Sequence, residues 1–357
     1  MNARLDGLAG SHDAPVTTMS IAMPGAVLLV GPLPPPSGGM ANQTMQLASL
    51  LGREDCQVTV VRTNAPYRPR WVGNLRGVRA LLRLLPYLWR LWRGARHADV
   101  AHIMANSGWA WHLFAAPAVW IAWASGLPVV LNYRGGDASA FFDRHFRCVR
   151  PTLSRVARVV VPSGFLAEVF QRYGIATTIV PNIVNLEAFY PALTVPLSPH
   201  VIVTRNLEAI YDVGTAIRAF ALVSERFPAA RMTVAGSGPA LKGLQLLAAG
   251  LRVNDRVTFA GPIDNAKLPD LYRSASIVVN ASLVDNMPIS LLEAMASGVP
   301  IVSTRVGGIP HLVEDGVTAL LVEAGDAPAM AAAISSLVGD PQRAAAMARN
   351  AAGVAKQ

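Results

Sequence analysis

Cysteine and charge are both scarce in this sequence of 357 residues. Only Cys56 and Cys148 are present, far apart, which excludes a disulfide framework and a cysteine-rich zinc site and fits a reducing cytosol. Charged residues make up 15% of the chain and hydrophobic residues 52%, a balance that excludes a disordered protein and favours buried parallel sheet. The length predicts two domains.

Signals for secretion and membrane insertion are also lacking. Residues 1–22 do not show the basic and then apolar pattern of a signal peptide, and we expect a disordered leader there. The segment from Trp109 to Leu131 is apolar, but two prolines and a glycine interrupt it. A membrane span needs about 20 uninterrupted apolar residues, so we expect no span.

Acidic residues are scarce in the first half of the chain. Residues 1–190 carry 18 Arg and 9 acidic residues, whereas residues 191–357 carry 13 basic and 13 acidic residues, so the first half holds the whole net charge of +9. Between Asp55 and Asp99 there are nine Arg and no acidic residue. Such an excess points to a fixed anionic partner, either nucleic acid or anionic lipid.

Arginines in the segment LRGVRALLRLLPYLWRLWRGAR follow a helical spacing, with Trp and Leu around the rest of the helix. Pro86 is expected to kink or split this helix. The pattern suits a helix in the headgroup plane of an anionic membrane, at the inner face of the cytoplasmic membrane. An ordinary surface helix packed on the sheet is the alternative. A nucleic-acid-binding helix is the third interpretation, but no DNA or RNA motif in the sequence supports it. The predicted membrane-binding residues are Arg76, Arg79, Arg83, Arg90 and Arg93.

Short apolar runs alternate with helix-length segments, from AVLLVG and QVTVVR to PIVST and TALLVE. This alternation predicts an α/β fold with two Rossmann-like, doubly wound parallel-sheet domains facing a cleft. The pattern lapses in a proline-rich stretch, so we predict domains at residues 23–190 and 201–357 joined by a linker at 191–200. Ligands bind such folds at the carboxyl ends of the strands.

The segment LVDNMPISLLEAMASGVPIVST predicts a helix that starts just past a strand. Pro288 suits the first turn, Asn286 or Met287 can cap it, and Gly298 suits the far end, so we expect a helix from about 288 to 297. Its free backbone N–H groups would attract phosphate or sugar hydroxyls in the cleft.

Two carboxylates belong to this segment. Asp285 precedes the helix and Glu293 lies in its second turn. A helix cap and a solvated surface residue are the simpler interpretations. However, Glu293 lies in an otherwise apolar stretch and needs a hydrogen-bonding partner, which the hydroxyls of a ribose could provide.

These motifs resemble the family-4 retaining glycosyltransferases of the GT-B fold. DNMPISLLEAMASGVPIVSTRVGGIPHLVEDGVTALLV is similar to the family's two carboxylates seven residues apart and the Gly-Gly loop beyond them. PPPSGGMANQTMQLASLL, VVPSGFLAEVFQRYGI, VPNIVNLEAFYP, TRNLEAIYDVGTAIRAFA and VAGSGP are similar too. The resemblance implies retaining transfer from a UDP-sugar or GDP-sugar to a glycan or lipid-linked acceptor, in cell-envelope or exopolysaccharide synthesis.

The resemblance also implies roles for particular residues. Glu293 matches the carboxylate that binds the donor ribose, and Asp285 matches a Glu beside the donor sugar. Arg205 matches the Arg that stabilises the donor diphosphate. Ile210 stands where the family's partner Lys belongs, so the electrostatic stabilisation of the leaving group is weaker or comes from another residue. Arg134 stands where many relatives carry a His facing the donor sugar, and its alternative interpretation is a loop Arg at the cleft edge.

Small residues complete the predicted donor site. Gly38 and Gly39 resemble a glycine loop whose N–H groups approach the phosphates, although either this pair or Gly307 and Gly308 can be a plain turn. Asp285, Arg205 and Arg134 are the predicted catalytic residues. The predicted substrate-binding residues are Gly38, Gly39, Gly236, Asn286, Met287, Ile289, Ser290, Glu293, Gly307 and Gly308.

No D-x-D motif occurs and the histidines are scattered. We therefore expect no metal and no cofactor, with the charge of the leaving nucleotide balanced by Arg205 and backbone dipoles. A catalytically silent nucleotide-sugar-binding subunit and a nucleotide-sugar epimerase of the same fold are alternative functions. The chain ends where the resembled enzymes continue into a crossing helix, so we expect domains tied only by the linker and an open cleft with weak donor affinity.

Overall fold

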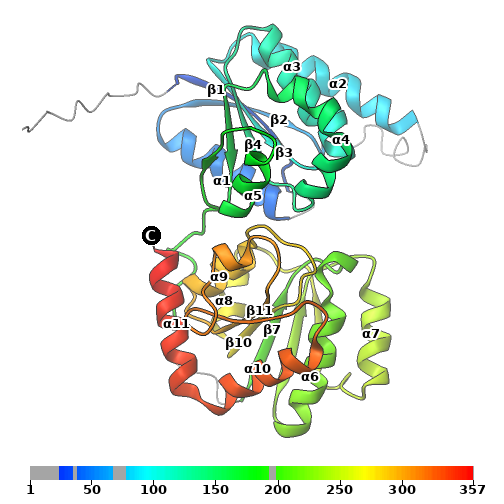
Figure 1. The fold of residues 1–357 in the computed structure, drawn as a ribbon, viewed down its shortest axis with the longest axis vertical. Helices are drawn as coiled ribbons and strands as arrows, with labels where there is room; N and C mark the ends of the chain where they lie inside the picture. The colour runs from blue at the N-terminus through cyan, green and yellow to red at the C-terminus, as the bar shows by residue number, and fades with distance from the viewer. Residues whose placement is uncertain (1–23, 35–37, 67–77, 193–197, 357) are drawn as a thin grey trace, which may run out of the picture.

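The protein has two α/β domains stacked along its long axis (Figure 1). The structure is a computed structural model that describes residues 24–34, 38–66, 78–192 and 198–356. The predicted leader, part of the predicted linker and Arg76 lie outside the described residues. Both sheets are parallel, which confirms the predicted fold class.

The first domain contains a six-stranded sheet in the order β2-β1-β3-β4-β5-β6. Helices connect successive strands, as parallel pairing requires. Its elements are β1 (Ala26–Gly31), α1 (Gly39–Arg53), β2 (Gln57–Arg62), α2 (Val78–Ala95), β3 (Val100–Ala105), the π-helical turn η2 (Trp111–Ala115), α3 (Ala116–Ala124), β4 (Val129–Tyr133), α4 (Ala138–Leu153), β5 (Arg158–Val161), α5 (Gly164–Gln171) and β6 (Thr178–Ile179).

The second domain contains a six-stranded sheet in the order β12-β11-β10-β7-β8-β9. Its elements are β7 (His200–Thr204), the 3-10 turn η3 (Ala209–Tyr211), α6 (Val213–Arg226), β8 (Arg231–Ala235), α7 (Leu241–Gly250), β9 (Val257–Gly261), α8 (Leu268–Arg273), β10 (Ile277–Asn280), α9 (Ile289–Ala296), β11 (Ile301–Thr304), the 3-10 turn η4 (Ile309–His311), β12 (Leu320–Val322), α10 (Ala327–Gly339) and α11 (Pro341–Ala355).

Strand burial explains why the apolar runs predicted the sheets. In β10 and β11 every residue is buried, and in β1 and β7 all but one residue is buried. Helices cover both faces of each sheet, so these strands are apolar throughout rather than alternating. In both sheets the loops that follow the strands line the cleft between the domains.

Two local expectations about helices are corrected by the structure. Helix α2 continues through Pro86, so of the two predicted effects of this proline, a kink or a split, the split is wrong, and the kink stays a prediction. Helix α9 lies within one residue of its predicted bounds, but Pro288 is its N-cap, and neither Asn286 nor Met287 caps it. The side chain of Asn286 instead donates to the first domain, as described below.

The apolar segment from Trp109 to Leu131 folds into η2, α3 and the first residues of β4. Burial of η2 and α3 against the first sheet accounts for part of this composition, because Trp111 and Val119 are fully buried. Across the described residues, no helix is both long and apolar enough to cross a bilayer.

The two domains contact each other directly, so the expectation that only a linker ties them is wrong. Asn286 donates through Nδ2 to the Gly135 carbonyl (2.7 Å), and Asn182 donates through Nδ2 to the Met287 carbonyl (2.7 Å). Helix α11 packs on α9 and ends beside the connection between the domains (Figure 1). How far the cleft opens in solution stays a prediction.

Candidate active site

A cleft of about 770 Å³ lies between the domains, at the carboxyl ends of the strands. Residues from both domains line it. Of the predicted site residues, those lining the cleft are Gly38, Gly39, Arg134, Arg205, Gly236, Asp285, Asn286, Met287, Ile289, Ser290 and Glu293. The structure thus brings together side chains that are more than 250 positions apart in the sequence.

Two helices begin at the cleft and face each other across it. Helix α1 begins at Gly39 after the extended Gly38, and α9 begins at Ile289 after Pro288. A Cβ on Gly39 would lie 3.3 Å from Ile289 Cδ1, so the two helix starts approach closely. Free N–H groups and the positive ends of both helix dipoles therefore favour an anion between them.

Glu293 on α9 is largely buried and has a protein partner. The Tyr272 hydroxyl donates to Glu293 Oε2 (2.9 Å) and lies 2.7 Å from Thr204 Oγ1. Burial raises the pKa of Glu293 to about 7, against the opposing effects of Tyr272 and Arg205. The site therefore holds a carboxyl group that is ionised only in part near neutral pH.

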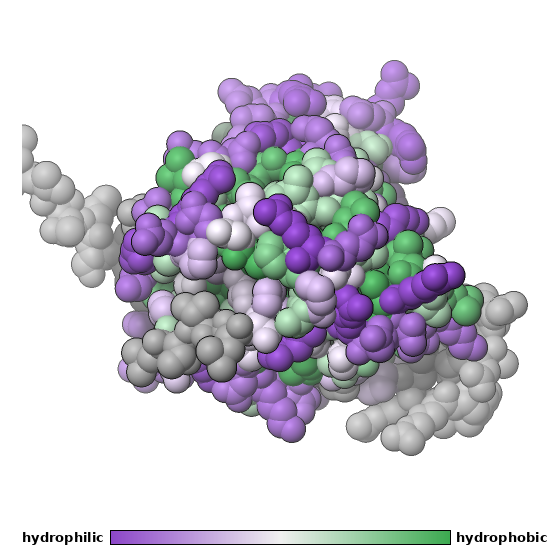
Figure 2. Space-filling model, turned by 90° about the horizontal axis from the view of Figure 1, so that it is seen from below, coloured by the Kyte–Doolittle hydropathy of each residue, from purple (hydrophilic) through white to green (hydrophobic). Residues whose placement is uncertain are grey.

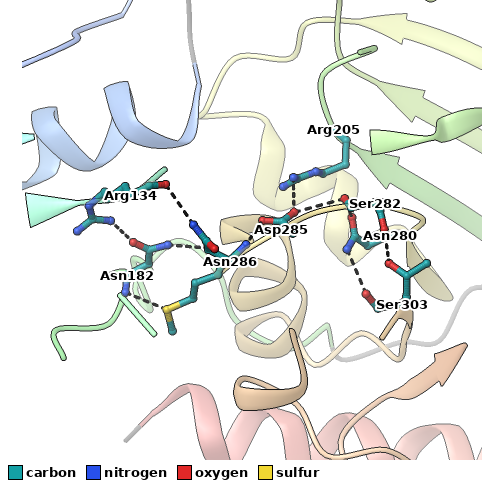
Figure 3. A network of polar contacts seen from close by, with 10 residues as sticks. Arg134, Asn182, Arg205, Asn280, Ser282, Asp285, Asn286 and Ser303 are labelled. Atoms are coloured by element: carbon teal, nitrogen blue, oxygen red, sulfur yellow. Dashed lines mark hydrogen bonds and ion pairs between the residues drawn. The ribbon is translucent and has the colours of Figure 1, made fainter. Parts of the chain in front are cut away.

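Asp285 is held by an ion pair with Arg205, drawn in Figure 3, that is largely buried, since the two side chains are only 12% and 13% exposed. The Arg205 guanidinium also stacks on the ring of Tyr211, at 4.1 Å from its centroid. Burial raises the pKa of Asp285, whereas Arg205, the Asn286 backbone N–H (3.0 Å) and the Ser282 hydroxyl (3.3 Å) lower it. These partners fix the carboxylate without a ligand.

Polar side chains behind Asp285 hold its loop in place (Figure 3). The Ser282 hydroxyl lies 2.8 Å from Asn280 Oδ1, and the Asn280 amide donates to Ser303 Oγ (3.1 Å). Thr304 Oγ1 donates to the Ser282 carbonyl (2.6 Å). Because these groups are buried, the loop after β10 is attached to β11 by bonds that water cannot replace.

Gly307 and Gly308 lie behind the cleft rather than on its surface. A Cβ at Gly307 would lie 1.9 Å from the Asp285 carbonyl oxygen, and one at Gly308 would lie 1.8 Å from that of Asn286. Gly236 similarly would meet the Arg205 carbonyl at 2.0 Å. The first two glycines thus leave room for the backbone of the carboxylate loop, and a direct contact with substrate stays a prediction.

The cleft holds few cations. Among the described residues that line it, Arg134 and Arg205 are the only basic side chains, and Ile210 is a partly exposed cleft residue. In the described part of the chain, no three His, Cys, Asp or Glu side chains gather closely enough to hold a metal ion. Independence from metal stays a prediction.

Sequence reasoning missed three residues of this site. Tyr272 holds Glu293, Thr204 holds Tyr272, and Asn182 contacts Arg134 and Met287. Tyr272 and Asn182 come from segments that resemble an ordinary surface helix and an interdomain loop. Only their positions in space reveal these contacts. The segment VPNIVNLEAFYP, which contains Asn182, is part of the family resemblance, but the resemblance implies no role for this Asn.

The arginines predicted to face a membrane divide into two groups. Arg76 lies outside the described residues, and the same holds for the side chain of Arg79. Arg83 donates through Nε (3.1 Å) and Nη2 (2.9 Å) to the Ala65 carbonyl, so it stabilises the loop after β2 instead of extending an exposed stripe.

Exposed tryptophans accompany the remaining arginines of this surface. Arg90 and Arg93 are exposed on α2, and Arg93 lies over the ring of Trp89 at 5.5 Å. Arg155 lies over two rings of α3, at 3.8 and 4.8 Å from their centroids. The exposed tryptophans of the two helices are Trp89, Trp92, Trp120 and Trp123.

Comparison with protein families accounts for both domains. Residues 198–354 match the family described as glycosyl transferases group 1, and residues 37–188 match glycosyltransferase family 4. The chain belongs to the group 1 glycosyltransferases. Within this family-4-type glycosyltransferase, the carboxylate loop and α9 fall in the group 1 match, and Arg134 falls in the family-4 match.

Curated relatives share a limited segment with this chain. A GDP-mannose-dependent alpha-(1-6)-phosphatidylinositol monomannoside mannosyltransferase of Mycolicibacterium smegmatis is 38% identical over 138 residues, 37% of this chain and 36% of the relative. A D-inositol 3-phosphate glycosyltransferase of Streptomyces avermitilis is 36% identical over 145 residues, 38% of this chain and 31% of the relative. The matches thus span about a third of each relative.

Solved structures resemble the whole glycosyltransferase chain. HepE of Anabaena, in complex with UDP and glucose, has a TM-score of 0.70 at 19% identity and covers 93% of this chain and 94% of its own. Sucrose-phosphate synthase of Thermosynechococcus elongatus has a TM-score of 0.74 at 20% identity, with the same coverage of both chains. At these identities the likeness shows the fold, which is the two-domain GT-B arrangement.

Proposed function

We propose that this protein transfers a sugar from a nucleoside-diphosphate sugar to a glycan or lipid-linked acceptor, with retention of anomeric configuration and without a metal. The observation that carries this proposal is the cleft itself. Two helix starts, the Arg205–Asp285 pair and the buried Glu293 converge there. Among the described residues, four buried polar atoms of cleft residues have no partner, namely Asn42 Oδ1, Arg205 Nε, Asn286 Oδ1 and Ser290 Oγ.

The donor would occupy the second domain's half of this cleft. Glu293 would accept hydrogen bonds from ribose hydroxyls, and it would do so more strongly when ionised. Arg205 and the N–H groups at Gly38, Gly39 and the start of α9 would balance the charge of the diphosphate. One relative's name includes GDP-mannose, and one similar solved structure is a complex with UDP. We therefore test both GDP-sugars and UDP-sugars as donors.

The reaction would replace one bond at the anomeric carbon of the donor sugar with another. The bond to the diphosphate oxygen breaks, and the bond to the acceptor oxygen forms on the same face of the sugar. The acceptor's proton passes to the departing diphosphate, so no separate base is required. Asp285, held anionic by Arg205, would lie beside the reacting sugar and stabilise positive charge there.

Hydrolysis and transfer assays with UDP-glucose, UDP-N-acetylglucosamine and GDP-mannose test this proposal. We expect one donor to be consumed with release of UDP or GDP, and we expect the rate to persist in EDTA. Binding of UDP or GDP without turnover would support a silent subunit. Conversion of the nucleotide sugar without release of the nucleotide would support an epimerase. Activity only after addition of magnesium or manganese would contradict metal independence.

We further propose that the first domain docks on the anionic inner face of the cytoplasmic membrane, where a lipid-linked acceptor would reside. Exposed Arg90 and Arg93 with the neighbouring tryptophans support this orientation, since Trp favours the membrane interface and Arg favours anionic headgroups. The end of the molecule formed by the second domain shows hydrophilic residues mixed with several hydrophobic areas (Figure 2).

A further inference from the structure

Among the described residues that line the cleft, Arg134 is the only basic side chain of the first domain; it is largely buried, and its bonding partners are neutral. Arg134, just past β4, donates through Nε to Asn132 Oδ1 (3.0 Å) and through Nη1 to Asn182 Oδ1. Burial lowers the pKa of Arg134 to about 10, so it is still a cation at neutral pH. Among the described residues no carboxylate lies within ion-pair distance of it, whereas Arg205 pairs with Asp285.

Both asparagines that hold Arg134 are oriented by a second partner. Asn132 Nδ2 lies 3.2 Å from His102 Nε2, and burial together with Arg134 lowers the pKa of His102 to about 4, so the neutral ring can accept this bond. Asn182 Nδ2 donates to the Met287 carbonyl. Because each amide nitrogen is engaged, each amide oxygen must face the guanidinium. Arg134 is therefore positioned before any ligand binds.

Asn182 also fixes Arg134 relative to the second domain. Its partner Met287 belongs to the loop between Asp285 and α9. From the same loop, Asn286 donates back to the Gly135 carbonyl (2.7 Å) and, in the longer bond drawn in Figure 3, to the carbonyl of Arg134 itself (3.4 Å). The two amides cross the interface in opposite directions, so the guanidinium and the carboxylate loop keep a constant separation while these bonds hold.

We propose that Arg134 is an anion subsite that binds a phosphoryl group in the cleft, and that Asn182 is a positioning residue for it. A buried cation with neutral partners lacks the countercharge that such a group normally has. A planar guanidinium matches phosphate oxygens in geometry as well as in charge. Ile210 is uncharged, and among the described residues of the second domain that line the cleft Arg205 is the only basic one, with its charge already shared with Asp285.

The phosphoryl group can belong to the donor diphosphate or to a phosphorylated acceptor. The first possibility rests on the function proposed above. The alternative to both is a purely structural Arg134, which joins the domains through Asn182 and binds no anion. These possibilities differ in one measurable quantity, the affinity of the protein for free phosphate.

Titration calorimetry of the full chain with inorganic phosphate at low ionic strength tests the subsite. We expect saturable binding to the wild type, loss of binding in Arg134→Gln and partial binding in Arg134→Lys. Asn182→Leu should weaken binding about tenfold, because it removes a hydrogen bond to a charged group. Asn182→Asp should weaken it too, since its carboxylate would neutralise Arg134, although a structural guanidinium would tolerate that change.

Asn185→Leu is the matched control. Asn185 lies in the same loop, and its side chain accepts from the backbone N–H of Glu187 (3.0 Å) without reaching the cleft. We expect its phosphate affinity to equal that of the wild type. Thermal unfolding of each variant identifies any loss of folding, and Arg134→Lys and Asn182→Asp keep the test informative if Arg134→Gln or Asn182→Leu does not fold.

Repeating the titration with saturating UDP or GDP identifies the source of the phosphoryl group. Displacement of phosphate by the nucleotide assigns the subsite to the donor, and undiminished phosphate binding assigns it to the acceptor. Equal phosphate affinity in wild type and Arg134→Gln, or no saturable binding to the wild type, would overturn the inference. If Arg134-dependent phosphate binding persists in a protein that consumes no donor, the proposed transfer fails and the subsite stands.

Discussion

The two halves of the cleft are built from different kinds of groups. The second domain provides charged side chains that already have partners, Arg205 with Asp285 and Glu293 with Tyr272. The first domain provides a glycine helix start, amides and the unpaired Arg134. Charged groups that are buried with partners hold their geometry but are costly when one partner is lost. The second half should therefore be the more sensitive to substitution, in stability as well as activity.

Arg205→Ala should have the largest effect, because it leaves Asp285 buried without a countercharge. We expect a loss of about 3–5 kcal/mol of unfolding free energy, and loss of donor turnover. Chemical denaturation measures the loss of unfolding free energy, and a donor-hydrolysis assay measures the loss of turnover. Arg305→Ala is the control, since it breaks a more exposed ion pair with Asp315 and should cost at most about 1 kcal/mol. Equal destabilisation by the two variants would contradict a special cost of the buried pair.

Glu293→Gln should stabilise the ligand-free protein at alkaline pH. The folded pKa of Glu293 is about 7, above its ordinary value of 4.5, so the folded state keeps a proton that the unfolded state has lost between these pH values. Stability of the wild type consequently falls as pH rises from 4.5 to 7, by an amount on the order of 3 kcal/mol.

Melting temperatures at pH 5 and pH 8 check this expectation. The difference between Glu293→Gln and wild type should be small at pH 5 and should favour the variant at pH 8. Glu225→Gln on α6 is the matched control, because it makes the same change of side chain at an exposed position. A Glu293→Gln protein that is less stable than wild type at pH 8 would contradict the assigned cost of the buried carboxylate.

Gly307→Ala tests whether the carboxylate loop depends on the glycine behind it. Gly307 has φ +52°, and its new Cβ would press on the Asp285 carbonyl at 1.9 Å. Gly325→Ala shares the positive φ, at +79°, but meets nothing within 4 Å, so it should cost only about 1–2 kcal/mol. We expect Gly307→Ala to lose more stability than this control and to lower donor affinity. Identical behaviour of the two variants would leave no supporting role for Gly307.

The smallest effect is expected outside the cleft, at the proposed membrane surface. Arg90→Gln with Arg93→Gln should weaken binding to phosphatidylserine vesicles by about 1 kcal/mol for each charge. Arg218→Gln with Arg226→Gln makes the same change of charge on α6 of the second domain and should leave binding unchanged. Sedimentation with vesicles distinguishes these outcomes, and binding insensitive to both pairs and to salt would rule out electrostatic docking.

The sequence was sufficient for the fold because the strands are buried on both faces. Their apolar runs, such as VIVT and SIVVN, directly predict β7 and β10. Helix α9 was predicted within a residue because Pro288 and Gly298 mark its two ends. For Pro86 the sequence allowed a kink or a split of α2, and the structure excludes the split, because α2 runs as one helix from Val78 to Ala95.

The contacts between side chains could not be predicted in the same way. Glu293 was recognised as a carboxylate that needs a partner, but the protein supplies that partner itself through Tyr272, from a different helix. Asn286 was expected to cap α9 and instead donates across the interface to Gly135. Such pairs depend on how two sheets are juxtaposed, and periodicity along the chain carries no information about that juxtaposition.

The pH dependence of nucleoside-diphosphate affinity tests the central claim, that Glu293 binds the donor ribose, most directly. Calorimetric titration of UDP and GDP should show one nucleotide bound more tightly as the pH rises through 7, because ionised Glu293 accepts the ribose hydrogen bonds more strongly. In Glu293→Gln the affinity should be weak and should lack this rise. Wild-type affinity for both nucleotides in Glu293→Gln, with the same pH profile, would contradict the account.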